Sequence, residues 1–258
     1  MYSEERRRQI ASLTAVEGRV NVTELAQRFD VTAETIRRDL AVLDREGVIH
    51  RVHGGAVANQ MFQTTELSLD TRARSASGAK NSIAHAALNF LPEPQGGMFL
   101  DAGTTTAALA DLLGIQPHAN QWSIVTNSLS IALTLANSGL DEVQLLGGAV
   151  RAITQAVVGD TALRTLALMR ADVAFIGTNA LTLDHGLSTA DSQEAAIKTA
   201  MITNARKVVV LCDSTKMGTD YLVSFASIDD IDIIITDENA PETFVRALRD
   251  RNVEVLIA

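Results

Sequence analysis

Seven short apolar runs alternate with stretches of helical periodicity from Gly97 to the end of the chain. Each run spans four to six residues, the usual length of a buried strand, and the segments between them are long enough for helices. The runs are 98–101, 122–126, 143–146, 173–176, 207–212, 231–236 and 253–257. This alternation predicts an α/β domain built on a mostly parallel sheet.

Polar residues and glycines follow most of these runs. In a parallel sheet ligands bind beyond the carboxyl ends of the strands, so these residues are expected to converge. After the first run, Asp101-Ala-Gly-Thr-Thr-Thr106 places a glycine and hydroxyls at a helix N-terminus, where backbone N–H groups favour an anion. The residues predicted to line a ligand site are Asp101, Gly103, Thr104, Thr105, Thr126, Asn127, Gly147, Gly148, Arg151, Asn179, Glu194, Lys198 and Lys216.

This set suits a polyol that carries a phosphate. We expect Thr104, Thr105 and a cation to bind the phosphate, and Asp101 and Asn127 to bind hydroxyls. Each element alone has a simpler interpretation, because a strand–Gly-Thr–helix turn occurs in many folds without a ligand. Glu194 and Lys198 lie four residues apart, and such a pair is typical of a helix surface. Their convergence at successive strand ends favours the site.

The first 57 residues show a different pattern. Three helical segments, at 4–15, at about 23–29 with Thr23 as N-cap, and from Thr32 to about 46, are followed by a hairpin at 48–57. Three short helices and a basic hairpin predict a winged helix-turn-helix, a DNA-binding fold.

The third helix has one apolar face and one basic face. Ile36, Leu40 and Leu43 recur at core spacing, while the opposite face carries Glu34, Arg38, Ala41 and Arg45, with Thr35 and Arg37 at its flanks. Arginines beside small residues allow close approach to base edges in the major groove. A solvated helix with a Glu34–Arg38 pair is the alternative. The predicted DNA contacts are Thr32, Thr35, Arg37, Arg38, Arg45, Arg51 and His53.

The net charge of −9 does not conflict with DNA binding, because the charge is distributed unevenly between the two parts of the chain. Residues 1–57 hold nine arginines, no lysine and nine acidic residues, whereas the remainder holds 13 basic and 22 acidic residues. A negative bulk keeps a protein off non-specific DNA, while a local arginine cluster can still bind. The domain division predicted is a DNA-binding domain at 1–57, a linker at 58–71 and a sensor domain at 72–258, with a helix over 71–91.

Other features point to a cytoplasmic protein without a metal site. No apolar run is long enough for a membrane span and the N-terminus does not look like a signal peptide. His50 and His53 lack further ligands at metal-binding spacing, and Cys212 ends an apolar run as a core residue would. We expect no metal, no cofactor and no membrane partner.

The string Val31-Thr-Ala-Glu-Thr-Ile-Arg-Arg-Asp-Leu40, followed by Arg51-Val-His-Gly-Gly-Ala56, resembles the signature of the DeoR family of bacterial repressors. This resemblance implies that Thr35, Arg37 and Arg38 enter or flank the major groove and that Arg51 and His53 serve the wing. From about residue 72 the chain resembles the DeoR-type sensor domain, which is similar to the ribose-5-phosphate isomerase fold. The subgroup it is most similar to, actinobacterial regulators of sugar phosphotransferase uptake, implies fructose- or glucose-derived phosphates as effectors.

The sequence therefore predicts a repressor of sugar uptake and metabolism genes whose affinity for a double-stranded operator changes when a sugar phosphate binds. Palindromic or repeated operators require a homo-oligomer, a dimer or a tetramer. Two alternatives remain open. One is a sugar-phosphate isomerase with a fused DNA-binding head, in which Asp101 and Glu194 form an acid–base pair. The other is an architectural DNA-binding protein with a purely structural second domain.

Overall fold

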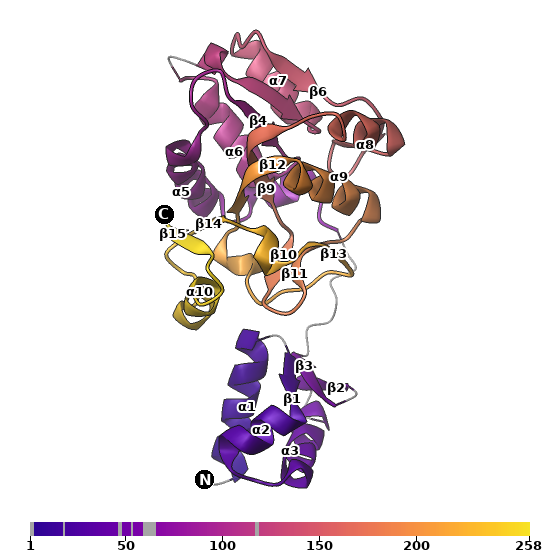
Figure 1. Ribbon diagram of the computed structural model, residues 1–258, viewed down its shortest axis with the longest axis vertical. Helices are drawn as coiled ribbons and strands as arrows, with labels where there is room; N and C mark the ends of the chain where they lie inside the picture. Colours follow the sequence, from indigo (N-terminus) through magenta and orange to yellow (C-terminus); the bar gives the residue numbers. More distant parts are fainter. Residues whose placement is uncertain (1–2, 18, 46–47, 53, 59–65, 117–118) are drawn as a thin grey trace.

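The computed structural model describes residues 3–17, 19–45, 48–52, 54–58, 66–116 and 119–258. The N-terminal part contains three helices and a small antiparallel sheet of order β1-β3-β2. Its elements are α1 (Ser3–Glu17), β1 (Arg19–Asn21), α2 (Val22–Phe29), α3 (Ala33–Arg45), β2 (Ile49–Val52) and β3 (Gly55–Ala58) (Figure 1). The predicted winged-helix arrangement is confirmed.

One apolar cluster holds this part together, and it includes the residues predicted to face inward from α3. Ile36, Leu40 and Leu43 are buried against Ile10 of α1 and Ile49 of β2. The predicted N-cap of the second helix is wrong, because the Oδ1 of Asn21 accepts from the backbone N–H of Thr23 at 2.7 Å and α2 starts at Val22. An asparagine caps as well as a threonine, so the sequence alone could not choose between them.

The hairpin packs closely on β1, a strand of three residues that the sequence analysis did not predict. Gly55 on β3 is paired with Asn21, and a Cβ at Gly55 would lie 1.9 Å from the carbonyl oxygen of Val20. Only glycine allows the two backbones to approach this closely. The second glycine of the His-Gly-Gly-Ala motif is therefore required by strand packing.

The larger part is built on the predicted parallel sheet. Each of the seven apolar runs forms a strand, in the order β15-β14-β12-β9-β4-β5-β6, and all neighbours are parallel. The strands are β4 (Gly97–Leu100), β5 (Ser123–Thr126), β6 (Val143–Leu145), β9 (Ala171–Gly177), β12 (Ala205–Leu211), β14 (Ile233–Thr236) and β15 (Glu254–Ile257).

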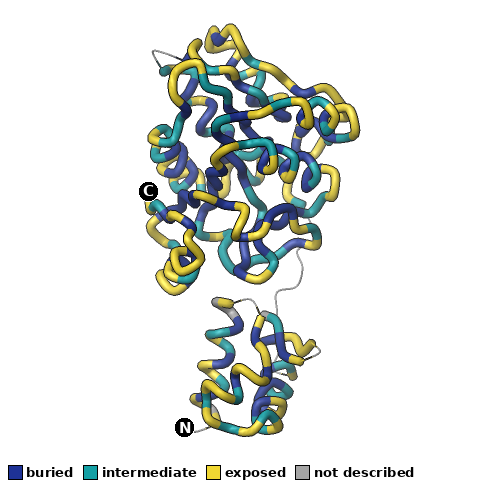
Figure 2. The backbone as a smooth tube through the Cα atoms, viewed as in Figure 1, coloured by how far each residue is buried: buried dark blue, intermediate teal, exposed yellow. Residues whose placement is uncertain are grey.

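Helices cover both faces of this sheet, with an apolar cluster under each layer (Figures 1 and 2). Alternate residues of one strand enter opposite clusters: Phe99 of β4 packs on one face, and Met98 and Leu100 pack on the other. The helices on the Met98 face are α5 (Ser77–Ala87), α6 (Thr104–Leu113) and α7 (Leu129–Asn137), and those on the Phe99 face are α8 (Asp160–Leu166), α9 (Ser192–Thr203) and α10 (Glu242–Arg249). The predicted fold class is confirmed.

The helix expected over 71–91 is two helices, so that prediction is wrong. The segment forms α4 (Leu69–Arg74), α5 and a short 3-10 turn, η1 (Leu88–Phe90). Ala76 between them has φ of 51°, which is incompatible with a continuous helix. Helix α4 begins within the last residues of the segment predicted as a linker, and the hydroxyl of Ser68 caps it by accepting from the backbone N–H of Thr71.

Shorter elements surround the edge of the main sheet, and their three or four residues carry too little periodicity to be predicted. They include an antiparallel sheet of order β10-β11-β13 and the hairpin β7-β8. Their bounds are β7 (Ala149–Arg151), β8 (Ala156–Val158), β10 (Ala180–Thr182), β11 (Gly186–Thr189), β13 (Val223–Ala226), and the 3-10 turns η2 (Ala119–Gln121), η3 (Ser214–Lys216) and η4 (Ile228–Asp230). Among the described helices, none combines the length and apolar character needed to cross a bilayer.

Candidate functional site

The outer face of α3 presents the predicted basic residues to solvent. The side chains of Arg37 and Arg38 are 56% and 81% exposed, and Glu34 lies 3.4 and 3.9 Å from them. Thr32 caps the helix as predicted, accepting from the backbone N–H of Thr35 at 3.2 Å, and their hydroxyls are 2.9 Å apart. Exposed pairs of this kind contribute little to stability, so the arginines are free to exchange Glu34 for a phosphate or a base.

The β2–β3 hairpin adds a second basic element beside α3. The backbone N–H of Arg51 donates to Oδ1 of Asp44 at 3.0 Å, which fixes β2 against the end of α3. Arg37 and Arg51 line one shallow groove between α3 and the hairpin. Arg45 is exposed at the last turn of the helix, and His53 lies outside the described residues. Helix and hairpin together form a basic surface suited to one strand of duplex DNA.

A buried ion pair beneath this surface was not predicted. The Nε of Arg6 donates to Oδ2 of Asp39 at 2.6 Å, and Arg7 lies 3.9 Å from the other oxygen. Two of the nine arginines are therefore occupied in fixing α1 to α3. The aspartate of the Thr-Ile-Arg-Arg-Asp-Leu motif thus has a structural role, and its position on the inner face of α3 was the signal for it.

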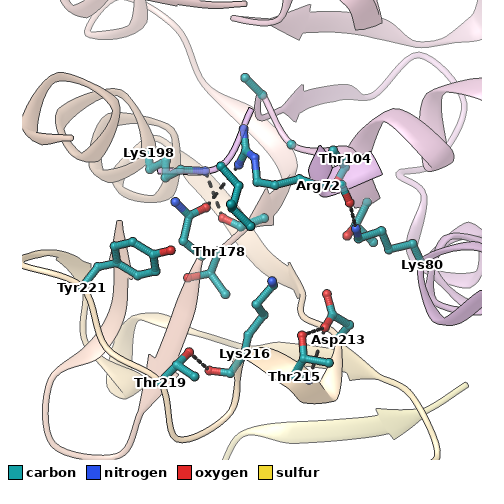
Figure 3. Close-up of a pocket in the computed structure, with 16 residues that line it drawn as sticks. Arg72, Lys80, Thr104, Thr178, Lys198, Asp213, Thr215, Lys216, Thr219 and Tyr221 are labelled. Carbon is teal, nitrogen blue, oxygen red and sulfur yellow. Dashed lines mark hydrogen bonds between the residues drawn. The ribbon is translucent and has the colours of Figure 1, made fainter. Parts of the chain in front are cut away.

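A pocket lies at the carboxyl edge of the main sheet, where the sequence predicted a ligand site (Figure 3). It encloses about 720 Å³ of empty space, including its open mouth. Of the predicted residues it is lined by Gly103, Thr104, Thr105, Asn179, Lys198 and Lys216. Residues outside that predicted set also line the wall: Leu67, Arg72, Lys80, Ala102, Gly177, Thr178, Asp213, Thr215, Thr219 and Tyr221.

The N-terminus of α6 forms one side of the pocket. Gly103 is its N-cap and provides no side chain to bind the first N–H groups of the helix. The hydroxyl of Thr106 donates to the carbonyl oxygens of Asp101 and Gly103 at 2.7 and 2.9 Å, which fixes the turn. The backbone N–H groups and the hydroxyls of Thr104 and Thr105 are therefore available to an anion in the pocket.

Cations from three separate elements face this helix end. Arg72 comes from α4, Lys80 from α5 and Lys216 from η3, and Figure 3 shows their side chains around the same space. The ammonium of Lys80 donates to the carbonyl oxygens of Arg72 and Ser75, the latter at 2.5 Å. Burial lowers the pKa of Lys80, Asp213 opposes that change, and Lys216 and Arg72 add to it. The positive charges of Arg72 and Lys216 therefore act on the ammonium of Lys80.

The floor of the pocket holds a buried ion pair. The ammonium of Lys198 donates to Oδ2 of Asp101 and, at 2.9 Å, to the carbonyl oxygen of Gly177. The N–H of Gly177 donates to the same Asp101 oxygen at 3.1 Å, whereas Oδ1 of Asp101 has no hydrogen-bond partner among the described residues. Burial raises the pKa of Asp101 and Lys198 counters this. Asp101 therefore neutralises Lys198 from beneath the pocket and is not itself part of the pocket wall.

The loop after β12 is rigidly held. Oδ1 of Asp213 accepts from the backbone N–H of Thr215 at 3.2 Å and from its hydroxyl. Asp237 supports the loop from the next strand, because its carboxylate accepts from the N–H and the hydroxyl of Ser214 at 2.6 and 2.9 Å. Lys216 is therefore presented to the pocket from a fixed backbone.

Seven of the predicted residues do not line this pocket, and one of them, Asp101, lies beneath it in the ion pair with Lys198. Asn127 bonds to the backbone: its Oδ1 accepts from the N–H of Ala102 and its Nδ2 donates to the carbonyl oxygen of Val157. The hydroxyl of Thr126 accepts from the N–H of Ser128. Both side chains are buried and shape the strand ends instead of meeting a ligand.

The predicted residues that follow β6 also lie away from the pocket. Gly148 packs against β8, where a Cβ would lie 2.5 Å from the carbonyl oxygen of Val158, and its neighbour Gly147 lies outside the pocket wall. Arg151 and Glu194 pair with each other at 2.5 Å. Glu194 and Lys198 share a face of α9 as predicted, but only Lys198 reaches the pocket.

Lys80 and Arg72 were not predicted as pocket residues, because neither follows a strand. Lys80 lies on the inner face of α5 in line with the buried Ala84 and Ala87, and a lysine in a row of apolar residues was the available signal. Arg72 follows the capped start of α4, whose boundary the sequence analysis misplaced.

Comparisons with known proteins agree with both parts of the structure. Residues 6–62 match the DeoR-like helix-turn-helix domain, and residues 75–238 match the DeoR C terminal sensor domain. The HTH-type transcriptional regulator GlpR of Haloferax volcanii is 38% identical over 92% of this chain and 91% of its own length. The glycerol-3-phosphate regulon repressor of Escherichia coli is 31% identical, covering 99% of each chain.

Among solved structures, ribose 5-phosphate isomerase A from Methanocaldococcus jannaschii aligns with 55% of each chain, with a TM-score of 0.42 and 17% identity. The two family matches include the basic surface of α3 and the hairpin, and all residues of the pocket wall except Leu67 and Arg72. The chain belongs to the DeoR family of transcriptional regulators.

Proposed function

We propose that this regulator is a repressor of sugar uptake and metabolism genes, and that a phosphorylated sugar in the pocket controls its affinity for the operator. The observation that carries this proposal is the convergence of Arg72, Lys80 and Lys216 on the uncapped N-terminus of α6. Three cations and a row of backbone N–H groups form a site for a doubly charged phosphate.

The charge of the pocket wall supports a phosphate. Its cations are Arg72, Lys80, Lys198 and Lys216, and Lys198 is neutralised by Asp101. Asp213 offsets one of the remaining three, which leaves an excess of about two positive charges, equal to the charge of a phosphate monoester near neutral pH. Hydroxyls and amides in the rest of the wall suit the polyol.

For the sugar itself we propose a fructose- or glucose-derived phosphate, the effector expected of a regulator of sugar phosphotransferase uptake. The pocket supports a ligand of this polarity, because Thr178, Asn179 and Tyr221 add hydroxyl and amide groups to its wall. A relative named for the glycerol-3-phosphate regulon supports a phosphorylated polyol as the general class.

We further propose that the winged helix of residues 1–57 binds duplex DNA in the cytoplasm as part of a homo-oligomer. One copy offers one α3, and a palindromic operator requires two of them about 34–36 Å apart, one helical turn of DNA. Thr35, Arg37 and Arg38 would contact the major groove, and Arg51 the adjacent backbone.

The geometry disfavours the isomerase alternative. Glu194, one of the two carboxylates required, is bound by Arg151 and by the hydroxyl of Thr154 and lies outside the pocket. Asp101 is held in an ion pair with Lys198. Neither carboxylate is placed to exchange protons with a sugar in the pocket, so we propose a sensor without catalytic turnover.

Thermal unfolding of the full chain with glucose 6-phosphate, fructose 1-phosphate, fructose 6-phosphate, the free sugars and inorganic phosphate tests this proposal. We expect one sugar phosphate to raise the melting temperature and its free sugar to leave it unchanged. Lys216→Gln should remove the shift, while Lys207→Gln, a change at an exposed lysine away from the pocket, should retain it. A shift that survives Lys216→Gln would place the phosphate elsewhere and refute the assignment.

A further inference from the structure

Arg151 of β7 lies among three carboxylates. Its two terminal nitrogens donate to the two oxygens of Glu66 at 2.8 and 3.2 Å, in a bidentate pair. The same guanidinium donates to Glu194 at 2.5 Å and lies 3.4 Å from Asp191. The side chains of Glu66 and Glu194 are only 9% and 5% exposed. A bidentate pair shielded from water has one favoured geometry, so this cluster fixes the positions of the elements that contribute to it.

Two of these carboxylates belong to the start of α9. Asp191 is the N-cap, and its Oδ1 accepts from the backbone N–H groups of Gln193 and Glu194 at 3.0 and 2.9 Å. Thr154 of the β7–β8 turn also donates to Glu194. Arg151 therefore holds the first turn of α9, and one turn later the same helix places Lys198 in the pocket.

The third carboxylate belongs to the segment that enters the sensor domain. Glu66 is followed by Leu67, which lines the pocket, and the backbone N–H of Leu69 donates to Ile153 in the β7–β8 turn at 3.1 Å. Arg72 then lines the pocket from α4. Residues 66–72 and α9 thus each contact both the pocket and the Arg151 cluster. We call this closed ring of contacts, from the pocket through both segments to Arg151, the circuit.

Glu66 is also the side of this circuit that leads, along the sequence, to the winged helix. We propose that Arg151 is a positioning residue that couples occupancy of the pocket to the segment joining the two domains, through its bidentate pair with Glu66. This inference rests on the proposed function of the pocket. A phosphate that moves Lys198 or Arg72 displaces one side of the circuit, and the pair with Glu66 either carries the displacement to residues 66–72 or breaks.

The experiment compares Glu66→Gln, Arg151→Gln and the control Arg164→Gln in the full chain. Within the part of the chain that the structure describes, Arg164 forms an ion pair only with Asp160 on the exposed face of α8, so its loss removes an arginine without altering the circuit. The operator is a duplex selected by the native chain from a random-sequence pool. Its dissociation constant is measured without effector and with saturating glucose 6-phosphate or fructose 1-phosphate, beside the thermal shift that each phosphate produces.

We expect Glu66→Gln and Arg151→Gln to retain the thermal shift, to change operator affinity without effector by about threefold or more, and to lose the further change on adding the phosphate. Arg164→Gln should match the native chain in all three. A purely structural role would lower the melting temperature but leave the ratio of the two operator affinities unchanged.

Native operator affinity and a native ratio in Glu66→Gln would overturn the inference. If Arg151→Gln fails to fold, Glu66→Gln decides, because it leaves Arg151 paired with Asp191 and Glu194. If no phosphate alters operator binding by the native chain, the proposed function fails, and the change in affinity without effector still tests the circuit.

Discussion

Arg6 and Asp39 form a buried ion pair that joins α1 to α3, the helix proposed to contact DNA. Both residues are less than one tenth exposed, and the pair lies directly beneath the basic face of α3. The orientation of that face therefore depends on an interaction that no DNA contact requires.

Asp39→Ala should strongly destabilise the winged helix. Removing one member of a buried pair leaves the other charge unsolvated, at a cost of about 3–5 kcal/mol. Hydrogen exchange of the full chain measures this locally: the amides of α1 and α3 should lose protection while those of β9 and β12 keep it. Asp160→Ala, at an exposed pair, is the control. Unchanged protection in α3 would show that the pair is not stabilising.

Arg38→Ala should abolish operator binding without unfolding the chain. The side chain is 81% exposed, so its removal leaves the core intact. A lost base contact costs about 1–3 kcal/mol per half-site, enough in a dimer to remove specific binding. A gel shift and a melting curve together check this, with Arg164→Ala as control. A folded variant that binds its operator with native affinity would contradict the assignment of α3 as the reading helix.

Gly55→Ala should distort the hairpin. The new Cβ would lie 1.9 Å from the carbonyl oxygen of Val20, so β1 and β3 must separate, at a cost of about 1–3 kcal/mol. Gly78→Ala is the matched control, because a Cβ there meets no atom within 4 Å and the position is helical. Exchange at the amides of β1 and β3 should accelerate in the first variant only. Equal exchange in both would show that the strands tolerate the methyl group.

Binding of a phosphate should be accompanied by proton uptake. Burial lowers the pKa of Lys80 in the free protein, and a phosphate beside it would raise that pKa. Between the two values the complex holds one more proton than the free protein, so affinity should fall as pH rises above the pKa of the free protein. Calorimetry with glucose 6-phosphate in two buffers of different ionisation enthalpy measures the uptake. Lys80→Met should remove it and Lys207→Met should not.

Regular periodicity made the fold predictable. The seven apolar runs and the inward face of α3 each repeat apolar residues at the spacing of a buried strand or helix, and these residues are buried in the structure. Boundaries were less predictable: Asn21 displaced Thr23 as a cap, and the break at Ala76 depends on a single backbone conformation. Three-residue strands such as β1 exist only because a neighbouring strand pairs with them.

The pocket was predicted where residues follow strands directly, as Gly103, Thr104 and Lys216 do. It was missed where the side chain comes from a covering helix, as with Lys80, because the sheet topology does not reveal which helix crosses the strand ends. Asn127 and Arg151 have side chains suited to a ligand site but do not line the pocket. The sequence alone cannot distinguish such residues from those that do. Their partners, Ala102, Val157 and Glu66, are distant along the chain.

The reactivity of the single cysteine can be used to measure transient opening of the main sheet. Cys212 is fully buried at the end of β12, and burial, reinforced by Asp213, raises the pKa of its thiol, so the folded chain offers thiol reagents almost no thiolate. The rate of its alkylation therefore measures how often the sheet opens. Because an effector bound at the strand ends must slow that opening, ligand binding becomes readable by mass spectrometry in unpurified extracts, without a label and without knowledge of the operator.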